Sequence, residues 1–65
     1  MSKYNYTPKK IIKILQQHDF HFVRQNGSHA LFKNFQNNKK VIVPIHSKDL
    51  PSGTTRAIFK DAGII

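Results

Sequence analysis

The stretch FHFVRQNGSHALFKNF, residues 20–35, decides the fold of this chain. It holds two runs rich in apolar and aromatic residues, of the kind that favours strands, on either side of Asn26-Gly27. A two-residue hairpin turn favours positive φ angles, which Asn and Gly tolerate best. The sequence therefore predicts an antiparallel hairpin with strands at 20–24 and 28–35 and with Asn26-Gly27 at the turn.

Alternation of side chains assigns a face to each residue of these strands. Successive strand residues point to opposite sides of a sheet, so Phe20 and Phe22 share one face of the first strand. The second strand is expected to place Ala30, Phe32 and Asn34 on one face and His29, Leu31 and Lys33 on the other.

A third strand is expected at 40–45. Val41, Ile42 and Val43 are strong β-formers, and Pro44 closes the run because it has no N–H for the ladder. The polar residues 36–39 would turn the chain back into it. We predict that all three strands are antiparallel.

A helix is expected on each side of the strands. Thr7 can cap free backbone N–H groups and Pro8 fits the first helical position, so the first helix begins there and ends near Gln17. Its apolar stripe consists of Ile11, Ile12, Ile14 and Leu15. The last helix follows a loop at 46–53, and Gly63 is placed to cap it in a left-handed conformation. Its expected stripe is Thr55, Ile58, Phe59 and Ala62.

A chain of 65 residues allows only one domain, residues 1–65. Three antiparallel strands expose a face that must be covered, and two amphipathic helices are the available cover. We therefore predict an α+β fold, a two-layer sandwich in the order α-β-β-β-α.

The charge favours a polyanion as partner. Eleven Lys and Arg against three Asp and Glu give a net charge of +8, although such charge can also serve solubility alone. Nucleic acid is expected ahead of a membrane surface, because the basic residues are spread along the chain. No apolar run resembles a signal peptide or a membrane span, so we expect a cytoplasmic protein.

The residue types exclude several kinds of chemistry. Without cysteine, neither a disulfide nor a thiolate zinc site can form. Three unpaired acidic residues are too few for a two-carboxylate mechanism or a hard-metal site, and the four histidines form no helical i, i+4 pair. We expect no metal and no other cofactor.

A single histidine on a basic sheet is enough for cleavage of RNA. The ordinary pKa of histidine, about 6.5, suits proton transfer near neutral pH, and RNA supplies its own nucleophile, the 2′-hydroxyl. His29 and His46 are the candidates, each equally compatible with a structural role. His18 lies at the end of the first helix, where a cationic ring interacts favourably with the helix dipole, so a structural role is expected. His21 is expected to face solvent. Ser28 is not expected to act as a nucleophile activated by His29, because adjacent strand residues point to opposite faces and the imidazole would be out of reach of the hydroxyl.

Three segments together resemble the HicA family: RQNGSH at 24–29, VIVP at 41–44 with His46, and DLPSGT at 49–54 leading into RAIFKDAGI at 56–64. The resemblance implies a fold like the double-stranded-RNA-binding domain and a metal-independent cleavage of mRNA. It implies neutralisation by a HicB-type antitoxin, with operator DNA contacted only through that antitoxin. It also implies that His29, the histidine of Gly-Ser-His, is catalytic. The sequence departs from the family in the polar Thr55 and in the leader at 1–6.

The expected site follows from these points. Gly27 permits the turn, Ser28 positions it, and His29 acts as general acid or base. The residues expected to contact RNA phosphates are Arg24, Lys33 and Lys39, with His46 as a further contact. Two alternatives stay open: a non-catalytic module that binds double-stranded RNA by its shape, and, less favoured, a DNA-binding regulator.

Overall fold

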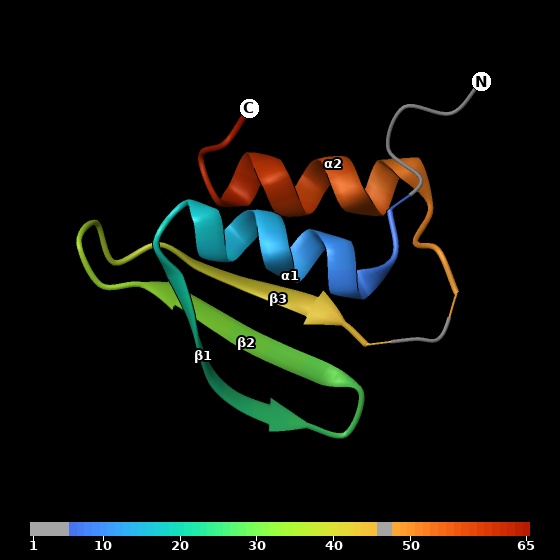
Figure 1. Cartoon of the computed structure of the whole chain (residues 1–65), viewed down its shortest axis with the longest axis horizontal. Coiled ribbons are helices and arrows are strands. Elements are labelled where there is room, and N and C mark those ends of the chain that lie inside the picture. The colour runs from blue at the N-terminus through green and yellow to red at the C-terminus, as the bar shows by residue number, and fades with distance from the viewer. Residues whose placement is uncertain (1–5, 46–47) are drawn as a thin grey trace.

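The computed structural model describes residues 6–45 and 48–65, which form two helices and three strands. In chain order the elements are α1 (Pro8–Gln17), β1 (Phe20–Asn26), β2 (His29–Asn34), β3 (Lys40–Pro44) and α2 (Ser52–Asp61). The strands form one antiparallel sheet in the order β1-β2-β3. Both helices lie on one side of this sheet (Figure 1). The predicted α+β sandwich is confirmed, and its layout agrees with that of a double-stranded-RNA-binding domain.

The core lies between the helices and one face of the sheet. Every element contributes apolar side chains that are at most 6% exposed, and removing such surface from water is the main stabilising term of a small domain. The buried residues are Ile11, Leu15, Phe20, Ala30, Phe32, Val41, Val43, Leu50, Ile58, Phe59 and Ala62. The predicted helical stripes and the predicted inner face of β2 are confirmed.

The helix ends follow the predicted capping chemistry. The Thr7 hydroxyl accepts a hydrogen bond from the Lys10 N–H at 3.2 Å, and Pro8 occupies the first turn. Gly63, with a φ of +77°, follows α2, and the N–H groups of Gly63 and Ile64 donate to the carbonyls of Lys60 and Phe59. This pair of bonds is a Schellman motif, which requires the left-handed conformation that glycine adopts without strain.

The hairpin turn lies one residue later than predicted. Asn26 pairs with His29, so Gly27 and Ser28 are the turn residues, and the assignment of the turn to Asn26-Gly27 is wrong. Gly27 has a φ of +57°, whereas Ser28 has no positive φ. A positive φ at the first turn position alone is typical of a type II′ turn, for which one glycine is sufficient. Asn26 therefore ends β1 as a strand residue.

β1 contains a bulge at Val23. Phe22 pairs with Phe32 and Arg24 pairs with Leu31, which leaves Val23 without a partner in β2. An extra residue of this kind reverses the alternation of side chains beyond it. Regular alternation from Phe22 would turn Arg24 toward the core. The bulge instead turns Arg24 to the open face of the sheet.

Asn34 fixes the end of the sheet opposite the hairpin turn. It is 6% exposed and shares the inner face of β2, as predicted. Its side-chain amide donates to the His18 carbonyl at 3.2 Å, and its Oδ1 accepts from the Gln36 N–H at 2.8 Å. A buried amide with both groups satisfied links α1 to the β2–β3 turn.

Candidate active site on the open face of the sheet

The open face of the sheet carries positive charge. Strand register places on it three rows of paired residues, none of them acidic: His21, Lys33 and Lys40; Arg24, Leu31 and Ile42; Asn26, His29 and Pro44. No helix covers these rows among the described residues (Figure 1). A surface with cations and no acidic side chain attracts polyanions.

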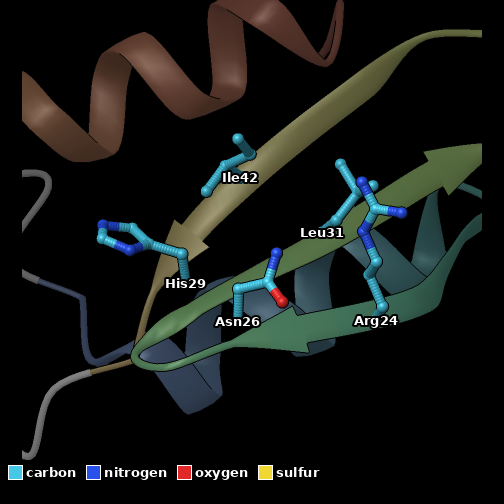
Figure 2. Close-up of a pocket in the computed structure, with 5 residues that line it drawn as sticks. All are labelled: Arg24, Asn26, His29, Leu31 and Ile42. Atoms are coloured by element: carbon cyan, nitrogen blue, oxygen red, sulfur yellow. The ribbon is translucent and has the colours of Figure 1, made fainter.

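The second and third rows enclose a pocket of about 90 Å³. It is lined by Arg24, Asn26, His29, Leu31 and Ile42, so all three strands contribute. Figure 2 shows the five side chains on the same side of the sheet, with Asn26 between His29 and Arg24. Leu31 and Ile42 are paired across β2 and β3 and give the pocket an apolar wall, although Ile42 is 56% exposed.

His29 has a fixed backbone and a free side chain. The Ser28 carbonyl accepts a hydrogen bond from the Ile45 N–H, which attaches the turn to the chain just beyond β3. Gln25 braces the same turn by donating from Nε2 to the Gly27 carbonyl at 2.9 Å. The His29 ring itself is exposed and makes no hydrogen bond to any residue that the structure describes. The described part of the chain therefore leaves both ring nitrogens unbonded.

Lys33 and Lys40 face each other directly across β2 and β3. Like charges in this position destabilise a sheet, unless an anion lies between them. Lys33 lies with its ammonium 5.0 Å from the ring centre of Phe35, while Lys40 is exposed. This pair extends the positive surface from the pocket toward the far end of the sheet.

A family model described as "HicA toxin of bacterial toxin-antitoxin" matches residues 8–64. The chain belongs to the HicA toxin family. The match covers every helix and strand of the fold. No curated protein matches the chain. Membership makes this protein the toxin of a toxin–antitoxin pair, whose partner is an antitoxin. Neither described helix is long and apolar enough to span a membrane.

The structure brings together some of the predicted site residues of this HicA protein. Arg24 and His29 line one pocket, and Gly27 and Ser28 form the turn that precedes His29. Lys33 lies on the same face as His29, two rows away.

One other predicted contact, Lys39, lies away from the pocket. Lys39 follows β2 in the turn at the far end of the sheet, beside Gly63, about 16 Å along the strand direction from His29. Its contact with RNA stays a prediction. His46 lies outside the described residues, so its role also stays a prediction.

Sequence reasoning missed Asn26, Ile42 and Lys40 as parts of this surface. Asn26 was missed because an Asn-Gly pair predicts a turn and not a strand residue. Ile42 was missed because a β-branched residue in a strand is expected to be part of the core. Regular alternation along 40–44 does contain the signal, since it places Lys40 and Ile42 on the face opposite Val41 and Val43.

The remaining described histidines lie away from the pocket. His18 caps α1, and its Nδ1–H donates to the Ile14 carbonyl at 3.0 Å. His21 is exposed on the open face, as predicted, and its ring lies 6.2 Å from that of Phe35. Within residues 6–45 and 48–65, no three His, Asp or Glu side chains come together in the manner of metal ligands.

Proposed function

We propose that this HicA-family toxin is a metal-independent endoribonuclease that cleaves mRNA, with His29 as its proton carrier. The observation that carries the proposal is the exposed His29 ring in one pocket with Arg24, on a face without acidic residues. Cleavage of RNA by its own 2′-hydroxyl requires a group that carries protons and a cation that holds the phosphate chain, and this pocket contains one of each.

The reaction proceeds without a covalent bond to the protein. The 2′-oxygen loses its proton and attacks the adjacent phosphorus, and the bond from phosphorus to the 5′-oxygen of the next nucleotide breaks. That oxygen gains a proton. His29 carries one of these two protons and water exchanges the other, which leaves a 2′,3′-cyclic phosphate and a 5′-hydroxyl. Arg24, in the same pocket, binds the phosphate of the neighbouring nucleotide through paired N–H donors and so holds the strand against His29.

The free state of the His29 ring suits this role. Neither ring nitrogen is engaged by a described residue, so either can exchange a proton with RNA. Two hydrogen bonds, to the Gly27 and Ser28 carbonyls, hold the turn before it, which limits the entropy lost when substrate binds. A binder of phosphate alone would gain more from Lys or Arg at this position than from an imidazole.

We infer that a HicB-type antitoxin silences the toxin by covering the open face. That face carries the paired lysines, Arg24 and the exposed Ile42, so a partner with acidic groups and an apolar contact fits it. Co-purification of the toxin with the protein encoded beside it tests this point. The inference predicts that the complex has no nuclease activity and that His29→Ala toxin still binds the partner. A complex that cleaves RNA at the rate of the free toxin contradicts it.

The nuclease itself is tested with purified toxin and a synthetic RNA. Cleavage is expected to continue in EDTA, to stop when the 2′-hydroxyl at the cut site is replaced by hydrogen or 2′-O-methyl, and to yield cyclic-phosphate ends. Loss of cleavage in EDTA contradicts metal independence. Tight RNA binding with no cleavage under any of these conditions would support the alternative, a non-catalytic RNA-binding module.

A further inference from the structure

We propose that the pocket beside His29 holds one unpaired nucleobase of the RNA next to the cut phosphate, and that Asn26 reads its edge. This inference rests on the proposed ribonuclease function and adds to it a substrate preference. No residue of the expected site served to recognise a base. The pocket has a surface for each of three parts of a nucleotide: the face of its base, the edge of its base and the phosphates on either side.

The first surface is the apolar wall. Leu31 and Ile42 pair across β2 and β3, and their side chains remain partly uncovered, with Ile42 56% exposed. An apolar patch of this kind beside cations offers the flat face of a base a contact away from water. The same wall offers nothing to a phosphate, so within an RNA substrate the part that matches it is the base.

The second surface is the side-chain amide of Asn26. It is exposed and makes no hydrogen bond to any residue in the described part of the chain. Figure 2 shows it between His29 and Arg24, on the same side of the sheet as Leu31 and Ile42. An amide carries both a donor and an acceptor, and its commonest bidentate match among the bases is the N6 and N7 edge of adenine. Asn26 is therefore expected to favour adenine.

The third surface is the charge at the two ends of the pocket. Arg24 lies at one end, where its guanidinium can bind a phosphate, and His29 lies at the other. A nucleotide within a chain has a phosphate on each side of its base. The order cation, amide, imidazole along the pocket thus matches one nucleotide with the cut phosphate at His29.

The size of the pocket selects unpaired RNA. A pocket of about 90 Å³ that is open on the uncovered face is on the scale of one base and not of a base pair. In an A-form duplex the bases are paired and stacked, and proteins recognise the helix by shape and 2′-hydroxyls. The pocket therefore favours single-stranded segments of a message.

The test is the base composition around the cut sites of a randomised RNA. Wild-type toxin is expected to favour adenine at one position beside the cut by at least about fivefold, as one bidentate amide contact allows. Asn26→Ala should remove this preference while cleavage continues, and Asn26→Asp should shift it toward cytosine, whose N4 amino group donates to a carboxylate. Circular dichroism checks that both variants remain folded.

Gln36→Ala is the matched control. Gln36 is an exposed amide in the β2–β3 turn at the far end of the sheet, and its side chain makes no hydrogen bond to a described residue. This variant should keep the wild-type preference. If Asn26→Ala kept that preference, or if it weakened only antitoxin binding, the proposed recognition of a base by this pocket would be wrong. The proposed ribonuclease function would be unaffected by that result.

Failure of the nuclease itself has a different outcome. If wild-type toxin cut no RNA, the proposed function would fail. The pocket would then be judged by nuclear magnetic resonance titration of His29→Ala protein with a short RNA containing adenine and with the same RNA lacking that base. Shifts at Asn26 and Leu31 that require the adenine support the pocket, and equal shifts with both RNAs overturn it.

Discussion

Arg24 lies directly opposite Leu31 in the β1–β2 ladder, because Val23 is bulged out of the pairing. In a regular ladder from Phe22, Val23 would face Leu31 and Arg24 would face Ala30, which is 1% exposed in the core. A charged side chain there would be costly to bury. The bulge therefore does two things at once: it protects the core and it delivers a cation to the pocket of His29.

This register is tested by disulfide trapping, since the chain has no cysteine of its own. Directly paired residues have Cα atoms about 4.5–5.5 Å apart, within the range that a disulfide spans. The double variant Arg24→Cys with Leu31→Cys should form an intramolecular disulfide in mild oxidant, as intact mass and free-thiol assays show. Arg24→Cys with Ala30→Cys should remain reduced, because those side chains point to opposite faces. The reverse result would mean that β1 has no bulge at Val23.

Thr55, the buried polar residue of the last helix, is predicted to lower the stability of the fold. Thr55 is fully buried, and its hydroxyl has no hydrogen-bond partner among the described residues. Thr55→Val keeps the shape and removes that group, so the free energy of unfolding should rise by about 1 kcal/mol and Tm by about 4–8 °C. Thr54→Val, at the half-buried neighbouring position, should change stability by less than about 0.5 kcal/mol. A loss of stability in Thr55→Val would show that the hydroxyl is bonded in solution.

The salt dependence of RNA binding should locate the phosphate contacts. Each phosphate contact on a single strand contributes about −0.7 to the slope of log affinity against log salt. In a His29→Ala background, which is expected to prevent cleavage, Lys33→Ala and Lys40→Ala should each flatten the slope by about that amount. Lys60→Ala, on the exposed side of α2, should leave it unchanged. A greater effect of Lys60 would move the RNA surface to the helical layer.

The helices, the faces of β2 and the two-layer fold could be predicted because their signals are local. Thr7-Pro8 and Gly63 mark helix ends by capping, and the burial of Ala30, Phe32 and Asn34 follows from alternation alone. The turn was misplaced because Asn26-Gly27 fits a type I′ turn as well as Gly27-Ser28 fits a type II′ turn. Only the pairing of Asn26 with His29 decides between them.

The bulge at Val23 leaves no mark of its own in the sequence. It adds one residue to a strand, and nothing in the order Phe22-Val23-Arg24 distinguishes a bulge from regular alternation. The approach of Asn26 and Arg24 to His29 depends on that residue. Hence His29 could be chosen from its motif, whereas the pocket around it required the three-dimensional register.

The rate at which His29→Ala toxin cleaves RNA under single-turnover conditions tests the central claim most directly. Removal of a general acid or base costs about 10²–10⁴-fold in rate, and none of the paired strand residues on the open face is acidic and able to replace it. His21→Ala is the matched control, because it deletes a histidine in the row of the open face that lies farthest from His29. The account predicts that His29→Ala remains folded and loses cleavage by at least about a hundredfold, while His21→Ala cuts at close to the wild-type rate. A folded His29→Ala toxin that cuts RNA within a few-fold of the wild-type rate would contradict it.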